Sequence, residues 1–89
     1  MAKLKRDQRT YVAFMLAGKR CPPMPVVVTL TRIGKKLLDD DNLASAFKHA
    51  RDQVAHWAGV DDGSPLYTWR YEQRIGKEYG IEIEIEERP

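Results

Sequence analysis

Residues 25–42 read PVVVTLTRIGKKLLDDDN, and this stretch decides the fold. Its first half, residues 25–33, is rich in β-branched side chains and predicts a strand. Because side chains alternate along a strand, one face would carry Val26, Val28 and Leu30. Gly34-Lys35-Lys36 interrupts the strand, and Leu37-Leu38 leads into the acidic run Asp39-Asp40-Asp41-Asn42.

The residues after the acidic run change to a helical period. One apolar stripe over residues 42–58 recurs at helical spacing: Leu43, Phe47, Ala50, Val54 and Trp57. Asp41 or Asn42 can cap this helix, and Gly59 can end it. A loop with the pair Asp61-Asp62 follows.

The flanking segments complete a single domain over residues 1–89. Residues 4–17 predict a helix ended by Gly18, whereas residues 66–74 and 79–87 alternate as two strands of a hairpin. The expected fold is therefore α/β (α+β) in the order α-β-α-β-β, with helices packed on a mixed sheet. An 89-residue chain has a thin core, so we also expect a homodimer.

Composition narrows the class of protein. Hydrophobic residues make up 43% and charged residues 31%, which argues against disorder. No apolar run is long enough for a membrane span, and the single Cys21 excludes an internal disulfide, so we expect a cytoplasmic protein without a membrane partner. Residues 1–36 carry nine Lys/Arg and one acid, whereas residues 37–89 carry six basic and twelve acidic residues. This charge asymmetry would allow the basic segment to bind a phosphate backbone next to a cation site in the acidic segment. The alternative is that the charges lie on solvated faces and that their uneven distribution has no function.

The two acidic clusters are the main candidates for chemistry. In an α/β layer the run at Asp39 and Asp41 and the pair Asp61-Asp62 can meet, and such oxygen ligands suit Mg²⁺ or Mn²⁺. Lys48 could then hold a phosphate. The structural alternative is an N-cap cluster, an Asp-Asp-Gly turn, and a solvated lysine that pairs with Asp52.

The remaining candidate residues are weaker evidence for a catalytic or binding site. His49 and His56 lack partners at zinc-ligand spacing, so we interpret them as residues of the helix flank or of an interface. Cys21 has no nearby base, so we interpret it as structural. The row Tyr67, Trp69 and Tyr71 could stack bases, but such a row more often belongs to a core or a dimer interface.

The pattern Asp39-x-Asp41-Asn42, then Lys48 and Asp52, then Asp61-Asp62, resembles the RusA-type endodeoxyribonucleases, which resolve Holliday junctions. The resemblance runs from about residue 5 to residue 87. It differs in three respects. This chain lacks the family's additional N-terminal strand, and the usual lysine position is Ser45, three residues before Lys48. The family's usual Gln-Val or Gln-Ile after the acidic pair is also absent, since Gly63-Ser64-Pro65-Leu66 occupies that stretch.

The resemblance implies a dimeric, Mg²⁺-dependent (or Mn²⁺-dependent) endonuclease that cleaves phosphodiester bonds in branched DNA. It implies Asp39, Asp41 and Asp62 as catalytic metal ligands, Asp61 as an alternate ligand and Lys48 as a contact to the scissile phosphate. The DNA-binding residues would be Arg32, Lys35, Lys36, Asn42 and Lys48. The alternatives are a DNA-binding module of the same fold without cleavage, and a protein-interaction domain whose acids are caps and turns.

Overall fold

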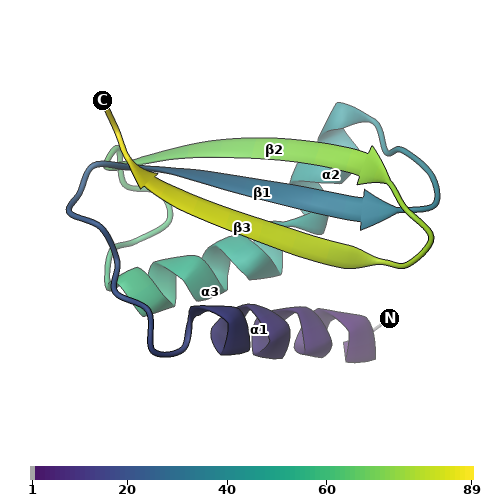
Figure 1. The fold of residues 1–89 in the computed structure, drawn as a ribbon, viewed down its shortest axis with the longest axis horizontal. Helices are drawn as coiled ribbons and strands as arrows, with labels where there is room; N and C mark the ends of the chain where they lie inside the picture. Colours follow the sequence, from purple (N-terminus) through teal and green to yellow (C-terminus); the bar gives the residue numbers. More distant parts are fainter. Residues whose placement is uncertain (1) are drawn as a thin grey trace.

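A computed structural model describes residues 2–89, with side chains described from Gln8 onward. Over this range the chain forms three helices and a three-stranded sheet, and α1 and α3 lie on the same side of the sheet (Figure 1). The elements are α1 (Ala2–Leu16), β1 (Val26–Gly34), α2 (Asp40–Ala46), α3 (Lys48–Ala58), β2 (Tyr67–Ile75) and β3 (Gly80–Glu87). The predicted α+β class is confirmed.

The sheet is mixed, in the order β2-β1-β3. Strand β1 runs parallel to β2 and antiparallel to β3, so that Leu30 lies between Tyr71 and Ile83. The hairpin predicted from residues 66–74 and 79–87 is therefore wrong, because β1 lies between β2 and β3 and those two strands do not pair with each other. Alternation assigns the faces of a strand but not its neighbour. A parallel pair needs a crossover, and α2 and α3 provide it. The crossover starts where β1 ends and returns to the start of β2, so it places the two acidic segments at opposite ends of β2.

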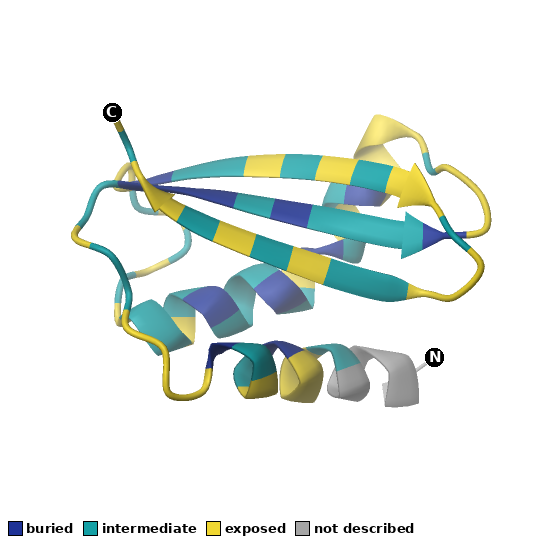
Figure 2. Ribbon diagram, viewed as in Figure 1, coloured by how far each residue is buried: buried dark blue, intermediate teal, exposed yellow. Residues whose placement is uncertain are grey.

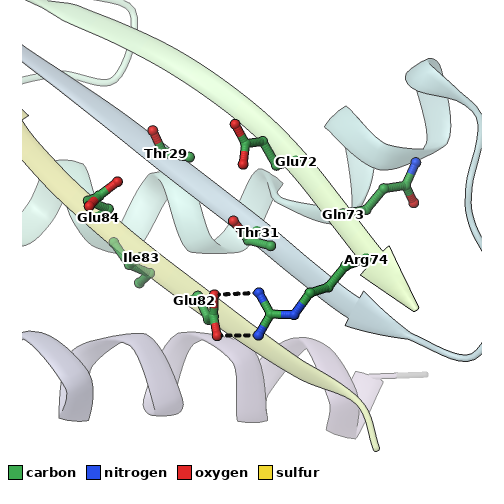
Figure 3. Close-up of a pocket in the computed structure, with 8 residues that line it drawn as sticks. All are labelled: Thr29, Thr31, Glu72, Gln73, Arg74, Glu82, Ile83 and Glu84. Carbon is green, nitrogen blue, oxygen red and sulfur yellow. Dashed lines mark hydrogen bonds and ion pairs between the residues drawn. The ribbon is translucent and has the colours of Figure 1, made fainter. Parts of the chain in front are cut away.

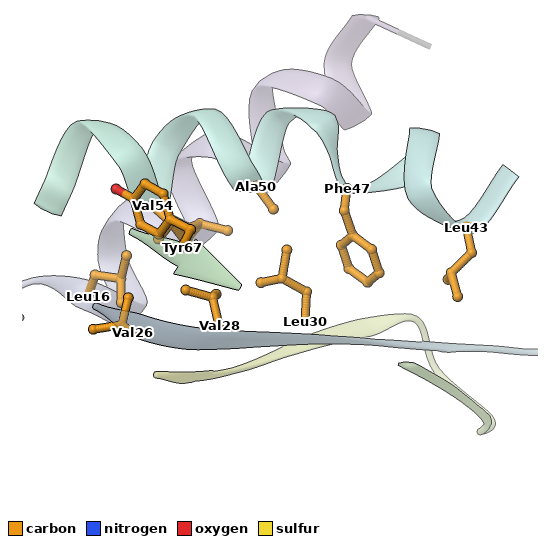
Figure 4. Packing of buried hydrophobic residues seen from close by; sticks show 10 residues of the cluster. Leu16, Val26, Val28, Leu30, Leu43, Phe47, Ala50, Val54 and Tyr67 are labelled. Carbon is orange, nitrogen blue, oxygen red and sulfur yellow. The ribbon is translucent and has the colours of Figure 1, made fainter. Parts of the chain in front are cut away.

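The core confirms the alternation predicted for the strands. Val26, Val28 and Leu30 are fully buried against Phe47 and Val54 of the helical layer (Figure 4). The aromatic row of β2 and the isoleucines of β3 face the same layer, which assigns the aromatic row to the core. Along β2 and β3, more buried and exposed residues alternate (Figure 2).

The single helix predicted over residues 42–58 is wrong, because α2 and α3 are separate helices joined at Phe47. In a continuous helix the Ala50 N–H would donate to the Ala46 carbonyl. Here the Gln8 side chain of α1 takes both groups: its Oε1 accepts from the Ala50 N–H and its Nε2 donates to the Ala46 carbonyl, each at 3.0 Å. A side chain inserted into the hydrogen-bond ladder is a recognised cause of a break.

The helix caps are also partly corrected. The N-cap of α2 is Asp39, whose Oδ1 accepts from the Asn42 N–H at 2.9 Å, and not Asp41 or Asn42. Gly59 ends α3 as predicted, with φ +75°, and Gly18 after α1 has the same φ. Both glycines adopt a left-handed conformation that other residues rarely take. Among the helices described, none is long and apolar enough to cross a membrane.

Candidate functional site

The first acidic segment is fixed to the edge strand β2 by one side chain. Gln73 Oε1 accepts from the Leu38 N–H at 2.9 Å, and Gln73 Nε2 donates to the Leu38 carbonyl at 2.7 Å. The side-chain amide of Gln73 thus forms with the backbone of Leu38, just before Asp39, the same pair of hydrogen bonds that a neighbouring strand would form. This pairing sets where the acidic run enters α2.

The acidic run itself lies in solvent. Asp39, Asp40, Asp41 and Asn42 are all exposed, and one oxygen of Asp39 is used by the cap of α2. Asp40 and Asp41 occupy the first turn of α2, where carboxylates interact favourably with the helix dipole. Capping of α2 therefore accounts for the placement of Asp39. Among the described residues, no side-chain hydrogen bond involves the carboxylate of Asp41.

The second acidic segment is held at the other end of β2. Tyr67 Oη donates to the Val60 carbonyl at 2.6 Å, and Trp69 Nε1 donates to the Asp62 carbonyl at 3.1 Å. Burial, followed by the nearby Cys21, Asp62 and Asp61, raises the pKa of Tyr67, so this hydroxyl stays a donor. Asp61 closes the predicted turn, because its Oδ2 accepts from the Gly63 N–H at 3.0 Å.

Arg51 of α3 joins the second acidic segment to the aromatic row. Its Nη1 donates to Tyr71 Oη at 2.7 Å, and its Nη2 donates to the Asp62 carbonyl at 3.3 Å. The same Nη2 lies 3.5 Å from Asp62 Oδ2, and the guanidinium carbon lies 4.7 Å from the centre of the Trp69 ring. Asp62 therefore faces a cation that the chain itself supplies.

The two acidic segments contact the same strand but remain apart. Their anchors, Gln73 and Trp69, are four residues apart on β2, which corresponds to about 13 Å. In the described part of the chain, no group of three or more His, Cys, Asp or Glu side chains could hold a metal ion. The expected convergence of Asp39, Asp41 and Asp62 is therefore not present in this conformation.

The helix break changes the setting of Lys48. Lys48 is exposed and begins α3, so it does not continue the face of α2 that carries Asp41 and Ser45. The proposed partner Asp52 pairs instead with Arg9 of α1, whose Nη2 lies 3.3 Å from Asp52 Oδ2. The Nε of Arg9 also donates to His49 Nδ1 at 3.2 Å, so this histidine lies on the flank of α3 that contacts α1.

The basic residues predicted to bind DNA lie where β1 ends. Lys35 and Lys36 are exposed, whereas Arg32 is partly buried. Arg32 Nη1 donates to the Lys36 carbonyl at 2.8 Å. Arg32 therefore shapes the segment that carries the two lysines, and the lysines are the cations available to a phosphate.

The sheet face opposite α1 and α3 contains a shallow pocket lined by threonines and carboxylates (Figure 3). Across it Arg74 donates two hydrogen bonds to Glu82, which lie on the two edge strands. These bonds and the arginine charge lower the pKa of Glu82. The pocket holds no site residue predicted from the sequence.

Three of these site-shaping residues could not be found from local patterns. Gln8, Arg51 and Gln73 act on partners more than ten residues away, and their spacing in the sequence carries no motif. For Arg51, the sequence offers one weak signal: it is a basic residue on the helix that connects the two acidic segments, where it could pair with a carboxylate. Cys21, interpreted as structural, has a pKa raised by burial, which leaves its thiol poorly reactive.

Comparisons of the chain with protein-family models, with curated proteins and with solved structures give no match.

Proposed function

We propose that this chain is a divalent-metal-dependent endonuclease that acts on branched DNA. The observation that carries the proposal is the anchoring of both acidic segments to one edge strand, through Gln73 at one end and Trp69 at the other. The RusA-like order of Asp39, Asp41, Asn42 and the Asp61-Asp62 pair supports it.

The carboxylates fit a hard divalent cation in type but not in arrangement. Asp39, Asp41 and Asp61 are exposed and make no ion pair with another described residue, so their oxygens can reach a hydrated ion. Asp62, however, is paired with Arg51, and the anchors of the two segments are about 13 Å apart. Cleavage would therefore need a rearrangement of the acidic segments, and the described conformation is not that of an assembled Mg²⁺ or Mn²⁺ centre.

Lysines beside the acidic run would provide the grip on DNA. Lys35 and Lys36 precede Asp39 by a few residues and are exposed, as is Lys48 at the start of α3. Lysines that neutralise phosphates release counterions, so binding should weaken steeply with salt. The substrate backbone would then pass next to Asp39 and Asp41.

A second candidate function is the binding of branched DNA without cleavage. The ion pair between Arg51 and Asp62 favours it, because an internal guanidinium already balances the carboxylate that would complete a metal site. The same lysines would serve both functions.

A homodimer in a reducing cytoplasm is part of the proposal. Strands β2 and β3 are the edges of the three-stranded sheet, and an unpaired edge is a common surface for association. Two copies related by a two-fold axis would suit a junction that needs two symmetric cuts. Sedimentation at micromolar concentration would test this, and a stable monomer would contradict it.

Incubation of the protein with a synthetic four-way DNA junction tests the proposed function. We expect retarded migration in EDTA or Ca²⁺, and nicked product with Mg²⁺ or Mn²⁺. Binding without nicking in either ion would leave the second candidate. No binding at low salt would contradict both, and a fully paired linear duplex is the control for branch preference.

A further inference from the structure

Three large apolar side chains are exposed together at the end of the sheet where β1 and β2 finish. Leu37 is 60% exposed, Ile75 is 59% exposed and Tyr79 is 70% exposed. They come from the segment that leaves β1 and from the turn between β2 and β3, which lie at the same end of the sheet (Figure 1). We call this surface, formed by residues 35–37 and 75–79, the strand-end surface.

The two parts of the strand-end surface are held together by specific contacts. The Gly76 N–H donates to the Gly34 carbonyl at 2.9 Å, which ties the turn to the end of β1. The guanidinium of Arg32 donates to the Lys36 carbonyl and lies 5.6 Å from the centre of the Tyr79 ring. One side chain thus supports both the lysine segment and the tyrosine.

Gly34 makes this support possible. A Cβ at position 34 would lie 2.6 Å from Nη1 of Arg32, which is closer than real contacts allow. The guanidinium takes this position across the strand end where no side chain is present, and a side chain at position 34 would displace it. The tyrosine ring is backed by Arg32 while most of its surface stays in solvent.

The charge around these apolar groups is positive. Lys35 and Lys77 line a shallow hollow together with Ile75 and Gly76. Lys36 adds a further charge, and Glu78 is the single acid in residues 35–37 and 75–79. Proteins that bind single-stranded nucleic acid combine exposed aromatic rings with cations, since bases stack on the rings while phosphates pair with the charges.

We infer that the strand-end surface binds an unpaired base of DNA, with the base stacked on Tyr79 and its flanking phosphates on Lys35 and Lys77. Bases inside a duplex are already stacked on both faces, so the ring selects a base that is unpaired or at an end. The chain runs from Lys36 through Leu37-Leu38 to Asp39, and the bound strand can follow it to the acidic run. This inference rests on the proposed function and names the feature of branched DNA that the protein recognises.

The test uses two duplexes that differ in one position. One carries a single unpaired 2-aminopurine, and the other carries the same 2-aminopurine in a pair. Tyr79→Leu keeps an apolar side chain without the ring, Tyr79→Phe is the matched control, and Tyr79→Trp enlarges the ring. Stacking on an aromatic side chain is typically worth about 5–150-fold in affinity.

We expect Tyr79→Leu to weaken binding of the unpaired-base duplex by about 5–150-fold while the paired duplex is unaffected. Tyr79→Phe should stay close to wild type and Tyr79→Trp should bind more tightly, a gain that misfolding cannot produce. Wild-type protein should also quench the unpaired 2-aminopurine. Lys77→Gln should weaken both duplexes equally and lower the salt slope by about one.

Equal binding of the unpaired-base duplex by wild type and Tyr79→Leu, with no gain in Tyr79→Trp, would overturn the inference and leave the proposed function standing. Absence of binding to both duplexes and to a four-way junction by wild type would overturn the two together.

Discussion

Replacement of Arg51 by methionine should free Asp62 for a cation and weaken the fold. Methionine keeps much of the aliphatic volume but loses the hydrogen bond to Tyr71, the bond to the Asp62 carbonyl and the contact with the Trp69 ring. The Arg51 side chain is 29% exposed, so solvent screening reduces each contribution. We expect a loss of about 2 kcal/mol in the free energy of unfolding, or about 8–16 °C in the melting temperature.

The same change should strengthen metal binding. A positive charge 3.5 Å from Asp62 Oδ2 opposes an incoming cation by about 1 kcal/mol in a partly exposed setting, or about fivefold in affinity. Thermal melts of EDTA-treated protein titrated with Mn²⁺ measure this, because an ion that binds the native state raises the melting temperature. Arg51→Met should start lower than wild type and respond at lower Mn²⁺ concentration.

Arg9→Met is the matched control, since it removes an arginine whose partner is Asp52 rather than Asp62. Its Mn²⁺ response should equal that of wild type. A folded Arg51→Met variant that binds Mn²⁺ no more tightly than wild type would refute the view that Arg51 competes for Asp62.

Three further changes test the contacts that shape the site. Gln8→Ala removes two hydrogen bonds but lets the backbone hydrogen bond from the Ala50 N–H to the Ala46 carbonyl form in their place. A thermal melt should therefore show a loss of only about 1 kcal/mol in the free energy of unfolding, and a loss above about 3 kcal/mol would contradict this compensation. Gln73→Leu removes both bonds to Leu38 and should cost about 2 kcal/mol and raise amide exchange at Leu38; unchanged exchange would argue against the anchor. Because the folded pKa of Glu82 lies below 4.5, its pair with Arg74 stabilises the fold fully above about pH 4.5 and loses this effect as pH falls further. Stability measured from pH 6 to pH 2 should fall less in Glu82→Gln than in wild type, and parallel curves would exclude a role for the pair.

The strands could be predicted from the sequence because their signal is local. Val26, Val28 and Leu30 occupy every second position, and a period of two assigns each of them to the same face without knowledge of its partners. The isoleucines of β3 give the same signal. The chain order and a mixed sheet were predicted from these strands, but the pairing of β2 with β3 was predicted wrongly, because alternation does not say which strand lies beside which.

The helix break and the state of the acidic site could not be predicted, because both depend on distant partners. The apolar stripe passes through Phe47 without interruption, and the break arises from Gln8, which lies on α1. In the same way, the pattern of acids in the sequence shows which carboxylates could bind a metal, but it does not show that the guanidinium of Arg51 lies beside Asp62. The spacing of residues along the chain predicts which of them share a face of one helix or strand. Whether the side chains of two loops meet depends instead on the residues that lie between the loops in the folded structure.

The central claim is that the acids at the start of α2 serve phosphodiester cleavage in branched DNA. Asp41→Asn tests it most directly, because Asp41 lies exposed in the first turn of α2 and Asp39, not Asp41, caps the helix. Asparagine keeps the shape and removes one negative charge, so the fold should persist and DNA binding should stay equal or become tighter.

The decisive measurement is nicking of a four-way junction by wild type and Asp41→Asn in Mg²⁺ or Mn²⁺, with binding followed in Ca²⁺. We predict that wild type nicks the junction and that the variant binds it without nicking. Nicking by Asp41→Asn at the wild-type rate, or a wild type that binds the junction and never nicks it, would contradict the claim.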